Sequence, residues 1–112
     1  MVLQFVETSI FTKRWNGLGL DDDDLRLLQK QLMTNPLCGE LIVGTGGARK
    51  IRFALPHKGK SGGARVIYVD VLQDKQVHLL LCYAKAKQEN LADDQKKQLK
   101  AIIKAIKEDR HG

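Results

Sequence analysis

Three runs of strand-forming residues follow one another in the middle of the chain, with only turns between them. The runs are Arg49–Ala54, Ala64–Val71 and Val77–Tyr83. A glycine-rich hairpin over Pro56–Gly63 joins the first two, and Asp74-Lys75 makes the tight turn between the last two. Because hairpins pair neighbouring strands in opposite directions, this part of the chain predicts a small antiparallel sheet.

Two helices are predicted before this sheet. Val2–Val6 reads as a short opening strand, after which Thr8-Ser9 offers an N-cap for a helix that ends near Asn16. The acidic tract Asp21–Asp24 suits the N-terminus of a second helix, because carboxylates cap free N–H groups and meet the positive end of the helix dipole. Asn35-Pro36 stops that helix.

A last helix is predicted from the capping residue Asn90 onward. Its inward stripe consists of Leu91, Gln95, Leu99, Ile102, Ile103 and Ile106. The expected order is therefore β-α-α-β-β-β-α, an α+β fold in which helices pack a small antiparallel sheet. With no repeat and no long linker, residues 1–112 are expected to form a single domain.

Charge and cysteine content indicate the kind of partner and the cellular compartment. A formal net charge of +6 and a sequence pI of about 9.5 favour nucleic acid or another anionic partner. Cys38 and Cys82 have neither CxxC spacing nor a nearby histidine cluster, so they indicate neither a zinc site nor a disulfide framework. Free thiols fit a reducing cytoplasm, and no apolar run approaches the length of a membrane span. We expect a cytoplasmic protein with no metal, cofactor or membrane partner.

The most basic stretch coincides with the first predicted hairpin. No aspartate or glutamate occurs from Leu41 to Val69, and this stretch carries Arg49, Lys50, Arg52, Lys58, Lys60 and Arg65. Lys50 and Arg52 alternate with apolar residues, so they share one face of their strand. The GTGG sequence at Gly44–Gly47 lacks a strand-to-helix setting and is interpreted as a turn rather than a phosphate loop. A cationic strip of this kind suits a polyanion.

The residues around this strip point to cation and tyrosine chemistry. Carboxylates lie elsewhere in the sequence, which argues against a two-metal nuclease. Lys50, Arg52 and Arg65, with Tyr83, Lys85 and Lys87 at the end of the last strand, can converge on one face of the sheet. Arginine offers bidentate donors to phosphate, and a lysine crowded by other cations can act as a base. RNA supplies its own nucleophile, the 2′-hydroxyl, so positioning, proton transfer and charge stabilisation suffice to cleave it.

Plainer interpretations stay open for the same residues. Lys58 and Lys60 can be hairpin-tip lysines that keep a sheet edge soluble, and Arg49 or Lys50 can be solvated face residues. The lysines of the last helix are most simply a solvated surface that attracts RNA at long range.

Two strings of the sequence resemble a known family. They are GTGGARKIRFALPHKGKSGGARVIYV, starting at Gly44, and CYAKAKQENLADDQKKQLKAI, starting at Cys82. Together with the opening strand, the helical pair and the Asn35-Pro36 turn, they resemble the RelE superfamily of type II toxins, in particular its HigB-like branch. The resemblance covers most of the chain and implies a RelE-like, microbial-ribonuclease-like fold.

The resemblance also implies an activity and partners. Such toxins are endoribonucleases, or mRNA interferases, that cut mRNA typically in the ribosomal A site. The 2′-hydroxyl attacks the adjacent phosphate without a metal and leaves a cyclic phosphate, so translation stops and growth is arrested. A cognate antitoxin, usually with a helix-turn-helix domain in this branch, silences the toxin, and the pair reaches operator DNA through the antitoxin.

Matched position by position, the resemblance gives roles to the basic residues. The paired basic positions of the family match Lys50 and Arg52, which with Arg49 and Lys87 form the expected RNA-binding set. Arg65 is expected to clamp the scissile phosphate, and Lys85 matches the basic positions after the last strand loosely.

The residue that moves the proton is left open. The tyrosine that members such as RelE carry at the entry to the last helix has no equivalent, because Asn90-Leu91 or Ala92 stands there. Lys58, Lys60 or Tyr83 can take the role. A non-catalytic RNA- or ribosome-binding module on the same fold, or an inactive toxin-fold regulator bound to an antitoxin, remains an alternative function.

Overall fold

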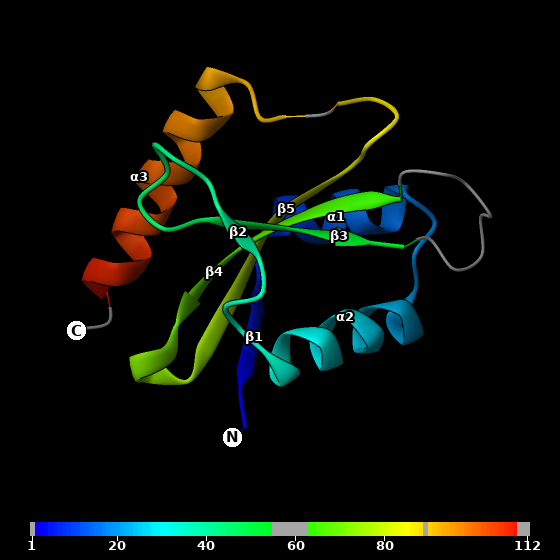
Figure 1. Cartoon of the computed structure of the whole chain (residues 1–112), viewed down its shortest axis with the longest axis horizontal. Helices are drawn as coiled ribbons and strands as arrows, with labels where there is room; N and C mark the ends of the chain where they lie inside the picture. The colour runs from blue at the N-terminus through cyan, green and yellow to red at the C-terminus, as the bar shows by residue number, and fades with distance from the viewer. Residues whose placement is uncertain (1, 55–62, 89, 110–112) are drawn as a thin grey trace.

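A computed structural model describes residues 2–54, 63–88 and 90–109 of the chain (Figure 1). The predicted element order is confirmed, with the addition of a two-residue strand and a short 3₁₀ helix. In chain order the elements are β1 (Gln4–Glu7), α1 (Ser9–Gly17), α2 (Asp22–Thr34), β2 (Glu40–Leu41), β3 (Arg49–Phe53), β4 (Ala64–Val71), η1 (Leu72–Asp74), β5 (Gln76–Ala84) and α3 (Asp93–Asp109).

The five strands form one sheet in the order β1-β5-β4-β3-β2. Strands β2 to β5 pair antiparallel, which was expected for β3, β4 and β5 and not for the additional strand β2. The β1 strand pairs parallel with β5, so the sheet is mixed, and the expectation of an antiparallel sheet is wrong at this edge. The helical connection through α1 and α2 returns the chain so that β3 runs parallel to β1, and after two hairpins β5 does as well.

The sheet lies between two helical layers, with α1 and α2 on one face and α3 on the other (Figure 1). The core on the α1–α2 face includes Phe11, Trp15, Leu28, Leu32, Ile51, Phe53, Val66 and Tyr68. The core on the α3 face includes Ala48, Ile67, Val69, Leu80, Leu81, Tyr83, Leu99 and Ile103. Because both faces are covered, the central strands β4 and β5 are largely apolar along their whole length.

Capping side chains fix where the first two helices begin. Thr8 Oγ1 accepts a hydrogen bond from Phe11 N at 3.0 Å at the start of α1. Asp21 and Asp24 form a reciprocal capping box at the start of α2, in which each side chain accepts from the other residue's backbone N–H. The interpretation of the acidic tract as a helix N-terminus is therefore confirmed.

The last helix begins later than predicted. It starts at Asp93 rather than following a cap at Asn90, so the predicted start is wrong. Gln95 supplies the local bond instead, because its Oε1 accepts from Ala92 N at 3.0 Å and from Gln88 Nε2 at 2.6 Å. These bonds tie the segment after β5 to the first turn of α3.

A one-residue irregularity interrupts β5. Ile67 pairs with Leu81 and Tyr68 pairs with Leu79, so Leu80 has no directly opposed residue on β4. The extra residue resets the alternation of side chains. As a result Leu80 and Leu81, although consecutive, both belong to the core on the α3 face.

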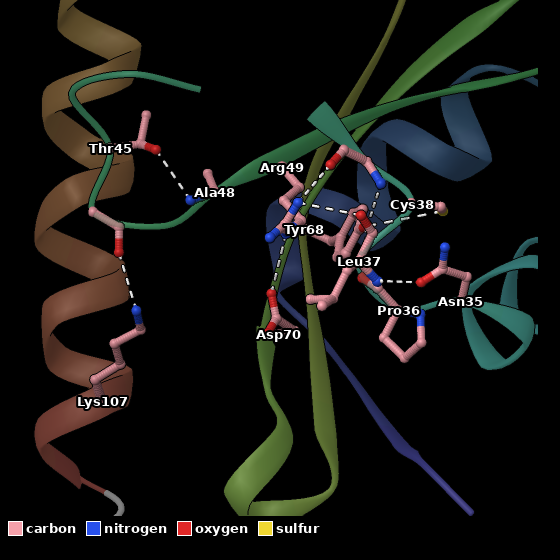
Figure 2. Close-up of polar contacts among 12 residues, drawn as sticks. Asn35, Pro36, Leu37, Cys38, Thr45, Ala48, Arg49, Tyr68, Asp70 and Lys107 are labelled. Atoms are coloured by element: carbon pink, nitrogen blue, oxygen red, sulfur yellow. Dashed lines mark hydrogen bonds and ion pairs between the residues drawn. The ribbon is translucent and has the colours of Figure 1, made fainter. Parts of the chain in front are cut away.

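The connector from residue 35 to residue 48 is fastened to the sheet and to α3 (Figure 2). Gly44 and Gly46 have positive φ angles of 86° and 78°, which confirms that GTGG is a turn. Within the turn, Thr45 Oγ1 donates to Ile42 O at 2.7 Å. Lys107 Nζ of α3 donates to Gly46 O at 3.1 Å. One lysine of the last helix thus contacts the turn, although its side chain stays exposed.

Candidate functional site

A row of three polar side chains crosses the sheet on the α3 face. In the strand register, Arg52 of β3 is opposite Arg65 of β4, and Arg65 is opposite Tyr83 of β5. Directly opposed residues have Cβ atoms about 4.5–5.5 Å apart. The structure therefore brings together three residues that the sequence placed on separate strands, and we call this set the Arg52–Arg65–Tyr83 row.

Lys50 flanks the row on the same face of β3. It is two residues from Arg52, and its neighbours across the sheet are the buried Ile67 and Leu81. Lys50 Nζ lies 3.5 Å from Asn90 Oδ1, in the segment before α3. The predicted alternation on β3 is confirmed, since Ile51 and Phe53 are buried on the opposite face.

Exposure decreases along the row from the sheet edge inward. The Arg52 side chain is exposed, Arg65 is half-buried and Tyr83 is buried with 5% of its surface exposed. A phosphate approaching this face would therefore meet the guanidinium groups first. Arginine side chains present fixed pairs of donors that match phosphate oxygens, so two adjacent arginines form a suitable binding place for one phosphodiester.

Gly63 closes the end of the row through backbone contacts. Its φ angle is +57°, and a Cβ there would lie 2.5 Å from Phe53 O, so a side chain at this position would strain the backbone. Gly63 O accepts from Lys85 N at 3.1 Å. These contacts hold the ends of β3, β4 and β5 together where Arg52, Arg65 and Tyr83 sit.

Lys85 and Lys87 follow the row in the turn after β5. Lys85 is half-buried and Lys87 is exposed. Lys87 N donates to Ala84 O at 3.1 Å, which keeps this turn close to the end of the strand. The structure thus places both lysines beside the row but on a connector rather than on the sheet.

Arg49 does not join the other predicted RNA-binding residues. It lies on the α1–α2 face, where its Nη1 donates to Leu37 O at 3.2 Å and Gly39 O at 2.8 Å (Figure 2). Its Nε lies 3.4 Å from Asp70 Oδ1, and both side chains are about four-fifths buried, at 18% and 21% exposed. The guanidinium of Arg49 is therefore directed to carbonyls and a carboxylate of its own chain.

Tyr68 is the centre of the same polar cluster. Its hydroxyl accepts from Gly39 N at 2.9 Å and donates to Pro36 O at 2.8 Å (Figure 2). Burial is the main cause that raises the pKa of this phenol to about 12. Tyr68 is thus a core residue. We call Arg49, Tyr68 and Asp70 the Arg49–Tyr68–Asp70 cluster.

Two of the predicted catalytic residues lie in the stretch between β3 and β4. Lys58 and Lys60 lie outside the described residues, which stop at Ala54 and resume at Gly63. Among the residues that are described, no group of three or more histidine, cysteine or carboxylate side chains could hold a metal ion. His78 lies on the half of β5 that pairs with β1, and burial lowers its pKa.

Sequence reasoning missed Asn90 and Gln95 as organisers of the site's margin. Asn90 contacts Lys50, and Gln95 holds the segment that follows Lys85 and Lys87. The available signal was the amide side chain of Gln95 on an otherwise apolar stripe. An amide on the inner side of a helix requires hydrogen-bond partners, and here they are provided by the connector.

Comparison with known proteins identifies the class to which this fold and this basic face belong. A family model described as the RelE toxin of the RelE/RelB toxin–antitoxin system matches residues 7–111. The chain therefore belongs to the RelE toxin family. Membership in a toxin–antitoxin family implies an antitoxin as partner.

A solved structure shows the same fold. The free state of a double-arginine mutant of the E. coli toxin RelE matches with a TM-score of 0.55 and 17% sequence identity. The match covers 80% of this chain and 90% of that chain. The expected α+β, RelE-like fold is thus confirmed. None of the helices in the described part of the chain has the length and apolar character needed to cross a membrane.

Proposed function

We propose that this chain is the toxin of a type II toxin–antitoxin pair and cleaves mRNA on the ribosome. The observation that carries the proposal is the Arg52–Arg65–Tyr83 row, flanked by Lys50, on a chain of the RelE family. The row gathers phosphate-binding groups and an ionisable hydroxyl on one face, which is what cleavage by the RNA's own 2′-hydroxyl requires.

In the proposed reaction, Arg65 and Arg52 bind the non-bridging oxygens of the scissile phosphate. The 2′-oxygen of the preceding nucleotide gives up its proton to a base and attacks phosphorus. The bond from phosphorus to the 5′-oxygen breaks, and that oxygen takes a proton from an acid. The products are a cyclic phosphate and a free 5′-hydroxyl, and the arginines stabilise the charge that develops in the transition state.

Four residues are candidates for the proton transfers. Tyr83 is opposite Arg65 in the register, and Lys85 follows two residues later, so both lie beside the proposed phosphate position. Lys58 and Lys60 stay candidates from the sequence. Lys50 and Lys87 complete the proposed RNA-binding set. Arg49 is left out of it, because its guanidinium contacts Asp70 and two backbone carbonyls.

Within the family, we assign the chain to the HigB-like branch on the strings that begin at Gly44 and Cys82. This assignment predicts a helix-turn-helix antitoxin and contact with operator DNA only through that antitoxin. Action in the ribosomal A site places the toxin in the cytoplasm. The net charge of +6 favours association with the polyanionic ribosome.

The test is induced expression followed by primer extension on translated mRNA. Wild type should arrest growth and produce new cut sites, and Arg65→Ala should lower cleavage at least about a hundredfold through loss of transition-state stabilisation. Arg26→Ala on α2 is the matched control, because Arg26 makes only an exposed ion pair with Asp23. Tyr83→Phe and Lys85→Met in the same assay separate the two described proton-transfer candidates.

Other outcomes decide against the proposal. Growth arrest without any cleavage would favour a non-catalytic RNA- or ribosome-binding module. Full activity of Arg65→Ala would remove the row from the mechanism. Neither arrest nor cleavage by the wild type would favour an inactive toxin-fold regulator.

A further inference from the structure

A groove with an apolar floor separates α1 from α3 on the outer side of β5. Its floor is Leu80 and Leu81, which face the same side because of the irregularity in β5. Ile10 of α1 and Ile102 of α3 also line it, together with Leu99 and the polar residues Arg14, Gln95 and Gln98. The groove encloses 110 Å³. A cavity of about 150 Å³ accepts a benzene ring, so this one has room for a single aliphatic side chain.

The walls of this groove are exposed apolar residues from two different helices. Ile10 is 53% exposed and Ile102 is 36% exposed. Ile102 was predicted to point inward, and the structure instead places it at the rim. Two exposed apolar residues that converge on one concave place offer an apolar contact to a partner.

A second hollow of 240 Å³ adjoins the first and has a different character. Arg14 lines both hollows, and Lys13 and Lys87 join it in the second. Among the residues that the structure describes, those that line the two hollows include no aspartate or glutamate. An apolar hollow beside a cationic hollow fits a ligand that carries an aliphatic side chain next to a carboxylate.

We propose that these two hollows, called here the α1–α3 groove, bind an acidic, apolar segment of the antitoxin. The inference rests on the proposed function, which supplies the antitoxin as partner. RNA would match the cations Lys13, Arg14 and Lys87 but would gain nothing from the apolar hollow, whereas a peptide with a leucine or isoleucine beside an aspartate or glutamate fills both.

A segment bound in the groove would lie close to the candidate functional site. Tyr83 lines the second hollow and also ends the Arg52–Arg65–Tyr83 row. Lys87 lines the same hollow from the turn after β5. An antitoxin segment that occupies the groove therefore lies against one end of the row, where it hinders the approach of RNA.

The experiment measures binding of the protein encoded by the reading frame next to this gene. It uses full-length chain in an Arg65→Ala background, so that the toxin can be produced. Arg14→Glu and Ile102→Asp should each weaken binding by at least about tenfold, since one places a like charge and the other an unpaired charge in the interface. The matched controls are Arg26→Glu and Leu27→Asp on α2, where Arg26 and the 51%-exposed Leu27 lie outside the groove.

The outcomes distinguish a failure of the groove proposal from a failure of the proposed function. Groove variants that bind as tightly as the controls would overturn the proposal while leaving the toxin–antitoxin assignment intact. No binding by the wild-type surface would overturn both. Because Arg14 is exposed, Arg14→Glu should fold even where Ile102→Asp does not. In the active background, Arg14→Glu should still arrest growth but escape neutralisation, whereas loss of arrest would indicate that the groove binds RNA instead.

Discussion

The two faces of β3 and β4 use arginine in opposite ways. On the α1–α2 face, Arg49 contacts Asp70 and two backbone carbonyls, and Tyr68 closes the same cluster with its hydroxyl. On the α3 face, Arg52 and Arg65 are directly opposed in the strand register, and Tyr83 continues the row on β5. Three positions along one strand thus separate an arginine that holds the fold from one suited to hold a ligand.

The face of a strand, rather than the residue type, thus decides the role of a cation on this sheet. Residues 49 and 52 differ by an odd number of positions, so their side chains point to opposite faces. Each face then supplies its own partners. An arginine paired with a largely buried carboxylate, such as Arg49 with Asp70, is part of the interactions within the fold. Neighbouring arginines such as Arg52 and Arg65 instead create a positive potential that favours an anionic ligand.

The largest loss of stability is expected for Gly39→Ala, next to the cluster on the α1–α2 face. A Cβ at Gly39 would lie 2.8 Å from Tyr68 Oη and 2.9 Å from Arg49 Cβ, so it would disrupt the Arg49–Tyr68–Asp70 cluster. We expect a loss of about 3 kcal/mol in the free energy of unfolding, measured by urea titration. Gly17→Ala is the control, because a Cβ there meets nothing within 4 Å. Equal stability of the two variants would show that the cluster is loosely packed.

A smaller effect is expected when the two arginines of β3 are compared directly. Arg49→Ala should lower the free energy of unfolding by about 1–2 kcal/mol, because it leaves Asp70 and two carbonyls without their partner. Arg52→Ala should change stability by no more than about 0.5 kcal/mol, since its side chain is exposed.

Cleavage should respond in the reverse order. Arg52→Ala should reduce it about tenfold to a hundredfold, and Arg49→Ala should leave it near the wild-type rate wherever the variant is folded. Primer extension at matched levels of folded protein measures the difference. Parallel losses of stability and cleavage in both variants would abolish the distinction between the two faces.

The smallest effect concerns Tyr68→Phe, which removes one hydroxyl from the cluster. We expect a loss of about 1 kcal/mol near neutral pH, because Pro36 O and Gly39 N lose their buried partner. The pKa of Tyr68 rises from 10.0 to about 12 in the fold, so its contribution is fully present below pH 10 and disappears as the pH rises toward about 12.

The variant should therefore lose less stability than wild type over the same alkaline range. Urea titrations at a series of alkaline pH values measure the two slopes. Burial also raises the pKa of Cys82 to about 12, so both proteins retain some alkaline loss from that thiol. Identical slopes would place the Tyr68 hydroxyl outside the energetics of the cluster.

Much of the fold could be predicted because the signals are local. The acidic tract at Asp21 and the strand Ala64–Val71 were assigned correctly from capping and residue pattern. The start of α3 was misplaced because Asn90 is a good cap by residue type, yet its side chain contacts Lys50 and the bond to the helix entry comes from Gln95. A capping signal reports what a residue can do, and the tertiary partners decide what it does.

For the candidate site too, some features could be predicted from the sequence and others depend on tertiary contacts. The sequence alone determined that Lys50 and Arg52 share a face, that cations dominate from residue 41 to residue 69, and that the chain belongs with RelE-like folds. Contacts between distant segments were needed to show that Arg52, Arg65 and Tyr83 stand in one row, that Arg49 contacts Asp70, and that β1 pairs parallel with β5. Side-chain alternation is a property of each strand by itself, whereas register and edge pairing depend on contacts between segments far apart in the chain.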